Sequence, residues 1–171
     1  RLVDFFNNDV YPIVYMQGSL GASGDLVPLA HMSLPLVGLG EVEYKGKVMS
    51  GAEVLKIHGW EPIQLASKEG LALLNGTQNM SAFAVWSLLN AQKLSDWADK
   101  IAAMSLDAYY GLLSPFTKAV HVVRPHKGQL DTAAHMLELL QGSEIADKPK
   151  DYVQDPYSFR CIPQVHGTTK D

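Results

Sequence analysis

The sequence predicts a mainly α-helical fold with one small β-hairpin. Apolar side chains recur at helical spacing over residues 82–94 and again over residues 129–141. Only residues 41–49 alternate around a tight Lys45-Gly46 turn, as a hairpin requires. A helical core with a minor hairpin is therefore the architecture that we expect.

The amino-terminal part of the chain divides at a glycine-rich loop. Residues 1–17 mix apolar and polar side chains, and we expect a short helix or an extended lead-in there. Residues 18–25 must form a loop, because three glycines in seven positions disfavour regular structure. The apolar residues 26–39 follow as a helix that Asp25 can cap, and Pro35 should kink it or end it early.

Helical patterns dominate the middle of the chain. Ser50 and Glu53 form a capping-box pattern, which predicts a short helix that ends at Gly59. A helical region then runs from Pro62 to about residue 113, with breaks near Gly70 and residues 75–77. Within it we expect a buried apolar stripe that consists of Phe83, Trp86, Leu88, Leu89 and Leu94.

The carboxy-terminal part contains one further predicted helix. Residues 129–141 carry an apolar side, and Gly142 should stop the helix. Residues 143–171 are rich in charged and polar side chains and contain three prolines, so we expect them to be irregular.

Composition narrows the possible functions. The chain has 171 residues, enough to bury roughly 70% of the surface of the unfolded chain. A formal net charge of -4 argues against nucleic acid or an anionic membrane surface as the main partner. The single cysteine, Cys161, excludes an internal disulfide and a multi-thiolate zinc site, and it favours a cytoplasmic location. We expect neither a membrane span nor a signal peptide, and a start at Arg1 suggests a processed or truncated product.

The glycine loop fits none of three common loop motifs. A P-loop needs Lys followed by Ser or Thr after its last glycine, but Asp25 follows Gly24. The glycine spacing differs from that of a dinucleotide fingerprint, and Ser23 lacks the spacing of a nucleophile elbow. The simplest alternative is a flexible turn that leads into a helix.

A different chemistry suits Ala22-Ser23-Gly24. The Gly24 nitrogen could attack the carbonyl carbon of Ala22, and loss of two waters would give a methylidene-imidazolone ring. Gly24 has no Cβ to obstruct this approach, Ala22 is small, and Ser23 supplies the leaving hydroxyl. The surrounding fold would have to hold the loop compressed, because a free loop would relax.

Three stretches resemble the aromatic amino-acid ammonia-lyases. Residues 18–32 resemble the family's signature, residues 69–78 its central helix motif, and residues 154–165 its active-site loop. The resemblance covers essentially the whole chain, but the family's proteins are longer at both ends. It implies a long-helix bundle core, with residues 1–171 as the central part of the lyase catalytic domain.

The resemblance also implies an activity. Gln78, Pro156 and Cys161 resemble the family's histidine-specific branch. That branch eliminates ammonia from L-histidine to give urocanate, through a ring that Ala22, Ser23 and Gly24 would form without an external cofactor. Two alternatives remain: a tyrosine or phenylalanine ammonia-lyase or aminomutase, and an inactive helical module that serves in assembly.

The resemblance assigns roles to four further residues. Asn75 would contact the ring or the substrate amine. Arg160 would bind the substrate α-carboxylate through its planar fork, Tyr157 would donate or transfer a proton, and Gln154 would orient the substrate. The alternatives are that Asn75-Gly76 only breaks a helix and that residues 154–160 form an exposed polar loop.

Partners and metals follow from the same reasoning. The resemblance implies a homotetramer with pockets built from several subunits and a small amino acid as substrate. The six histidines show no pair at zinc-binding spacing, so we predict no metal site. In the family, the catalytic base and a pocket carboxylate lie in regions outside this chain, so we expect the chain alone to be inactive.

Overall fold

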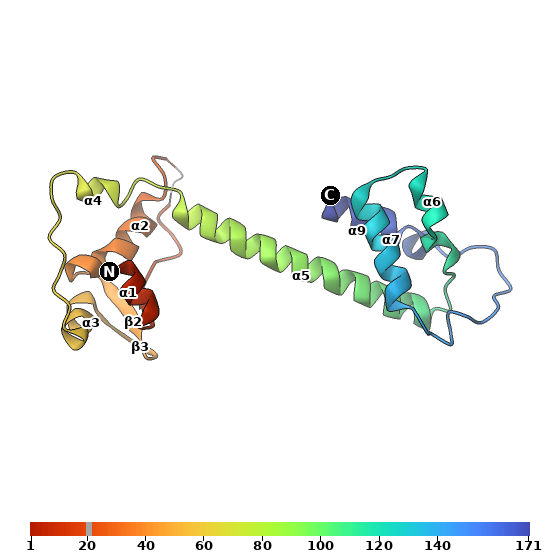
Figure 1. Cartoon of the computed structure of the whole chain (residues 1–171), viewed down its shortest axis with the longest axis horizontal. Coiled ribbons are helices and arrows are strands. Elements are labelled where there is room, and N and C mark those ends of the chain that lie inside the picture. Colours follow the sequence, from red (N-terminus) through yellow and green to blue (C-terminus); the bar gives the residue numbers. More distant parts are fainter. Residues whose placement is uncertain (20–21) are drawn as a thin grey trace. The chain divides into compact units, whose positions relative to one another are not determined.

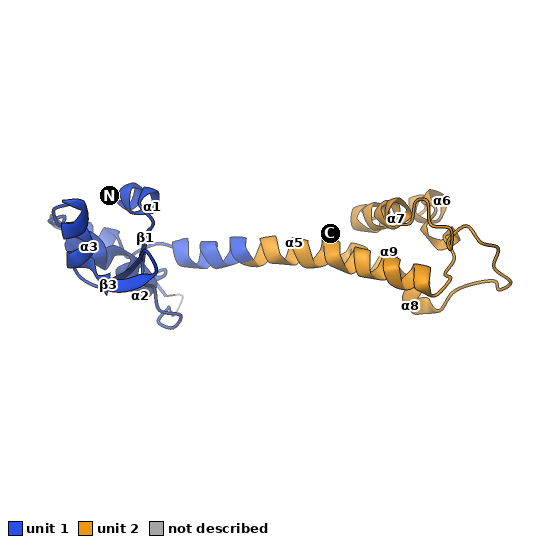
Figure 2. Cartoon of the chain, turned by 90° about the horizontal axis from the view of Figure 1, so that it is seen from below, with its two compact units in different colours: residues 1–86 blue, residues 87–171 orange. Residues whose placement is uncertain are grey.

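The computed structural model describes residues 1–19 and 22–171, which form two compact units, Arg1–Trp86 and Ser87–Asp171 (Figures 1 and 2). The boundary between the units lies within the longest helix, α5 (Gln78–Ala108). The fold is mainly helical with one small antiparallel sheet, as the sequence predicts. No described helix combines the length and the apolar character that crossing a bilayer requires.

The first unit contains the sheet. Helix α1 (Leu2–Asn7) leads to β1 (Val10–Pro12), which pairs with β2 (Glu41–Tyr44), and β2 pairs with β3 (Lys47–Ser50). The β2–β3 pair is the predicted hairpin. Strand β1 extends the hairpin to a sheet of three strands. The sequence did not predict β1, because three residues are too few to show an alternating pattern.

Two helical segments complete this unit. Helix α2 (Leu26–Ser33) passes into a 3₁₀ turn, η1 (Leu34–Val37), so the helix ends early before Pro35 as predicted. Helix α3 (Gly51–His58) begins at the predicted capping box. The Glu53 N–H donates to Ser50 Oγ at 3.3 Å, and the Ser50 N–H donates to Glu53 Oε2 at 2.9 Å.

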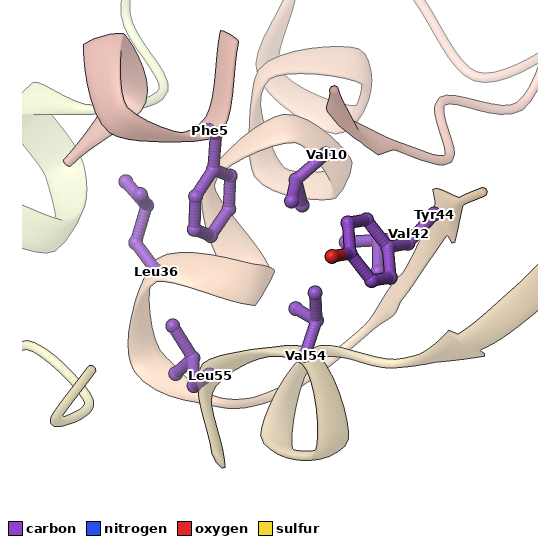
Figure 3. Close-up of a cluster of buried hydrophobic side chains, with 7 residues drawn as sticks. All are labelled: Phe5, Val10, Leu36, Val42, Tyr44, Val54 and Leu55. Atoms are coloured by element: carbon purple, nitrogen blue, oxygen red, sulfur yellow. The ribbon is translucent and has the colours of Figure 1, made fainter. Parts of the chain in front are cut away.

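The core of the first unit lies between α1, the sheet, η1 and α3. Figure 3 shows seven side chains that point toward one another: Phe5, Val10, Leu36, Val42, Tyr44, Val54 and Leu55. Complete burial of a side chain of this kind contributes about 1.5–3 kcal/mol. This core fixes β1, which precedes the glycine loop, and η1, which continues α2 after the loop.

The middle region is less helical than expected. Residues 62–68 contain no helix, and α4 (Glu69–Ala72) is a single turn before α5. The predicted buried stripe is wrong, because its five side chains are all more than half exposed. The buried positions of α5 lie further along the helix, at Asp99, Ala103 and Leu106, where the helix packs into the second unit.

The regular elements of the second unit are all helices. It contains the rest of α5, η2 (Ser114–Phe116), α6 (Lys118–Val122), α7 (Lys127–Leu139), α8 (Tyr157–Arg160) and α9 (Ile162–Lys170). Helix α7 matches the helix predicted over 129–141. The expectation of an irregular 143–171 region is wrong for α8 and α9. Pro163 does not prevent α9, because it occupies the first turn of that helix, where its missing N–H costs no helical hydrogen bond.

Candidate active site

The glycine loop has an unusual backbone at the residues that are predicted to condense. Ser23 has a φ of 57° and Gly24 a φ of 88°, so both lie in the left-handed region. A Cβ on Gly24 would lie 2.2 Å from the carbonyl oxygen of Gly76. Leu20 and Gly21 belong to the same loop but lie outside the described residues. The Ala22–Gly24 segment therefore lies directly against the Asn75-Gly76 turn.

Asp25 holds this arrangement with its backbone and its side chain. Its N–H donates to the Gly76 carbonyl at 2.7 Å. Its buried carboxylate accepts from Ser19 Oγ at 3.0 Å and from the Met80 N–H at 2.8 Å. Asp25 is the N-cap residue of α2, as predicted, but its side chain makes no capping hydrogen bond there; its carboxylate instead accepts from an N–H in the first turn of α5.

Asn75 lies beside the loop, but its amide is turned away from it. The Asn75 Nδ2 donates to the Leu71 carbonyl at 2.8 Å, and the residue is exposed. The neighbouring Gly76, and not Asn75, makes the contact with Gly24. In this structure the Asn75 amide itself closes the turn that follows α4.

A pocket opens on the amino-terminal side of the loop. Its volume is about 420 Å³, and its wall includes Tyr15, Gly18, Ser19, Asn79 and Phe83. The Tyr15 hydroxyl donates to Glu41 Oε2 at 2.9 Å, and this bond raises the pKa of Tyr15 above its usual value. Gly18 and Ser19 of the loop thus border this space.

The other predicted site residues lie in the second unit. Tyr157 and Arg160 share α8, and the Arg160 guanidinium carbon lies 5.4 Å from the centre of the Tyr157 ring. Arg160 Nε is buried and has no hydrogen-bond partner among the described residues. Gln154 is exposed on the segment before α8. The spacing of three thus brings Tyr157 and Arg160 together.

Sequence reasoning missed the residue that fixes this segment. Asp155 is only 3% exposed, and it accepts from the Leu112 N–H at 2.7 Å and from the Tyr152 hydroxyl at 2.9 Å. Desolvation, followed by the hydrogen bond to Asp155, raises the pKa of Tyr152 to about 12. The signal was present in the sequence as an acidic residue beside the predicted site residues.

Another buried carboxylate of the second unit anchors α9. Asp99 on α5 is fully buried and accepts from His135 Nδ1 at 2.8 Å, from His166 Nδ1 at 2.7 Å and from Lys170 Nζ. Burial raises the pKa of Asp99, but the hydrogen bonds from Lys170 and the two histidines outweigh it and hold the pKa below its usual value. Among the described residues no cluster of His, Cys, Asp and Glu is suited to a metal ion.

Comparisons with known proteins match the whole chain. Residues 1–171 match the family model described as aromatic amino acid lyase. The chain is 49% identical to the histidine ammonia-lyase of Chloroflexus aurantiacus over 100% of this chain and 33% of that protein. It is 50% identical to the histidine ammonia-lyase of Shouchella clausii over 97% of this chain. The chain therefore spans about a third of the length of the curated relatives that it matches.

Solved structures agree with the observed fold. The histidine ammonia-lyase of Trypanosoma cruzi matches with a TM-score of 0.81 and 40% identity, over 96% of this chain and 30% of that one. The tyrosine aminomutase of Streptomyces globisporus matches with a TM-score of 0.88 and 35% identity, over 98% of this chain and 35% of that one. These structures share the arrangement of helices and strands that is described above.

Proposed function

The chain belongs to the aromatic amino acid lyase family, and from this membership we propose that the protein eliminates ammonia from L-histidine to give urocanate. The reaction removes the α-amino group and one β-proton, which leaves an α,β-unsaturated acid. The observation that carries the proposal is the convergence of the Ala22–Gly24 backbone on Gly76, fixed by the buried Asp25. Identity of 46–50% to the curated histidine ammonia-lyases favours histidine as the substrate.

The residues present fit a methylidene-imidazolone group. Gly24 occupies a place where any Cβ would collide with Gly76, and Ser23 is already in the left-handed region. The Gly24 nitrogen bonds to the Ala22 carbonyl carbon, whose oxygen leaves as water. The Ser23 hydroxyl then leaves with the Cα proton as a second water. Once formed, the ring would supply an electrophile that makes the substrate amine a better leaving group.

The chain's own side chains bind and orient the substrate. Arg160 is the candidate for the α-carboxylate because a guanidinium offers two parallel donors to a carboxylate, and its buried Nε has no hydrogen-bond partner among the described residues. Tyr157 lies against Arg160 and donates or transfers a proton, while Gln154 orients the substrate. Asn75 donates to negative charge that develops near the loop once its amide turns from Leu71.

The proposal extends to the assembly and location of the whole protein. We place it in the cytoplasm as a homotetramer with no external cofactor and no metal, acting on a small amino acid. Identity of 35% to a tyrosine aminomutase keeps a tyrosine or phenylalanine lyase or aminomutase as the second candidate. A silent assembly module is the third.

Substrate screening of the protein purified in the form in which its source organism makes it, here called the naturally produced protein, tests the proposal. We expect urocanate and ammonia from L-histidine, and no product in a Ser23→Ala variant. Cinnamate or coumarate from phenylalanine or tyrosine, or a β-amino acid, would instead support the second candidate. Absence of any product from all three amino acids would support the silent module.

A further inference from the structure

Asp155 is the buried charged group closest in sequence to the predicted substrate-binding residues, yet the proposed reaction gives it no task. It lies between Gln154 and Pro156, and Pro156 is the N-cap residue of α8. The N–H groups of Phe159 and Arg160 donate to the Pro156 carbonyl at 3.0 and 3.2 Å. The position of Asp155 therefore sets where α8 begins, and α8 carries both Tyr157 and Arg160.

Both carboxylate oxygens of Asp155 are used. Oδ2 accepts from the Leu112 N–H at 2.7 Å, and Oδ1 accepts from the Tyr152 hydroxyl at 2.9 Å. The same hydroxyl also lies 2.6 Å from the Tyr110 carbonyl oxygen. Asp155 and Tyr152, which we call the anchor pair, thus join residues 152–160 to the segment that follows α5.

The segment that receives the anchor pair is itself fixed. Tyr110 has a φ of 61°, and the Gly111 N–H donates to the Leu106 carbonyl at 2.8 Å, so the chain turns sharply at the end of α5. Within α8, the Phe159 ring stacks on Tyr109 with 4.8 Å between ring centres. Helix α8 is therefore held against the residues that follow α5 both through Asp155, which precedes it, and through Phe159.

We infer that Asp155 is a positioning residue for the active site, which holds Tyr157 and Arg160 in place through the anchor pair. This inference rests on the proposed function. A short helix of four residues has little stability of its own, so its placement depends on such external contacts. A displacement of about 1 Å in a binding group can lower the rate by about 100-fold.

The test compares Asp155→Ala with Asp155→Asn in the naturally produced protein. Alanine removes both acceptors, and we expect the KM for L-histidine to rise by about 10- to 100-fold. Asparagine still accepts from Leu112 and can donate to the Tyr152 oxygen, so we expect rescue to within about threefold of the parent. The matched control is Asp151→Ala, an exposed carboxylate four residues earlier, which should change KM less than about twofold.

A merely structural role would lower the amount of folded enzyme without changing KM. A folded Asp155→Ala protein whose KM stays within about twofold of the parent would overturn the inference. If Asp155→Ala does not fold, Tyr152→Phe decides, because it removes one hydroxyl from a partly exposed side chain. A rise in KM of about threefold or more supports the anchor pair, and an unchanged KM refutes it.

Hydrogen exchange separates this inference from the proposed function. If the parent protein releases no urocanate, the proposed function has failed, and exchange at the Phe159 and Arg160 amides still decides whether Asp155 holds α8. Faster exchange at both amides in Asp155→Ala supports the placement, provided that Asp151→Ala exchanges as the parent does. If Asp155→Ala does not fold, Tyr152→Phe takes its place in this comparison. Equal exchange in the parent and in the anchor-pair variant contradicts the placement.

Discussion

Gly24 and Gly76 lie so close that a Cβ on Gly24 would be 2.2 Å from the Gly76 carbonyl oxygen. The two residues are 52 positions apart, and they come from the two motifs of the first unit that are predicted to form the active site. The backbone hydrogen bond from Asp25 to Gly76 closes the same contact. The proposed reactive tripeptide, Ala22 to Gly24, thus lies so close to the Gly76 turn that position 24 has no space for a side chain.

Replacement of Gly24 tests that contact. We expect Gly24→Ala to lower the free energy of unfolding by about 3 kcal/mol, because it adds a backbone collision to a left-handed φ. The matched control is Gly46→Ala, since Gly46 has a φ of 74° but no atom within 4 Å of a built Cβ. It should cost about 1 kcal/mol. Equal losses in urea unfolding would show that Gly76 does not restrict position 24.

Asp25 is expected to hold the loop against the start of α5. Removal of its carboxylate in Asp25→Ala leaves the Met80 N–H and the Ser19 hydroxyl without their acceptor, at a cost of about 2 kcal/mol. Asp25→Asn should cost less, because an amide can accept from Met80 and donate to Ser19. Faster hydrogen exchange at the Met80 amide in Asp25→Ala is the local measurement, and unchanged exchange there would contradict the assignment.

Acid should destabilise the second unit through Asp99. The folded pKa of Asp99 lies below its unfolded value of about 3.9, because hydrogen bonds from Lys170 and two histidines outweigh its burial. Its stabilising effect is complete above about pH 4 and is lost as the pH falls through the folded pKa. We expect thermal unfolding of the parent to show this acid dependence and Asp99→Asn to flatten it, whereas parallel pH profiles would refute the role.

Alkaline titration should reveal Tyr152. Its pKa of about 12 exceeds the ordinary value near 10, so the folded state favours the protonated phenol. The stability that this phenol contributes is complete below about pH 10 and is lost as the pH rises toward 12. Ultraviolet titration should show a tyrosine that titrates near pH 12 and is lost in Tyr152→Phe, and a phenol at position 152 that titrates normally would contradict the hydrogen bond to Asp155.

Replacement of Arg160 by lysine tests whether the substrate carboxylate needs a planar guanidinium or only a positive charge. Arg160→Lys keeps the charge but loses the bidentate geometry, so we expect the KM for L-histidine to rise about tenfold. The Ala22–Gly24 loop lies in the other unit, so the mass of its peptide should not change. A KM within about twofold of the parent would remove Arg160 from substrate binding.

Local features were predictable from the sequence. The capping box of Ser50 and Glu53, the early end of α2 before Pro35 and the stop at Gly59 all depend on residues a few positions apart. The same reasoning placed Asp25 correctly at the N-cap of α2 but missed the partner of its carboxylate, which accepts from the Met80 N–H 55 residues away. The spacing of neighbouring residues in the sequence does not identify such distant partners.

Burial and weak elements were harder to predict. The stripe from Phe83 to Leu94 has the periodicity of a buried face, but periodicity does not identify what covers that face. Helix α9 was missed because its proline and polar residues resemble a loop, while its stability comes from Gly128 against Gly167 and from Asp99. Asp155 was missed because its partners, Leu112 and Tyr152, become visible only in three dimensions.

Peptide mass spectrometry of the naturally produced protein tests the central claim most directly. We predict that the peptide containing Ala22, Ser23 and Gly24 is lighter than its sequence requires by the mass of two waters. In Ser23→Ala the same peptide should have the full mass of its own sequence. A full-mass peptide in the folded parent protein would show that the tripeptide remains open, and the proposed chemistry would then be wrong.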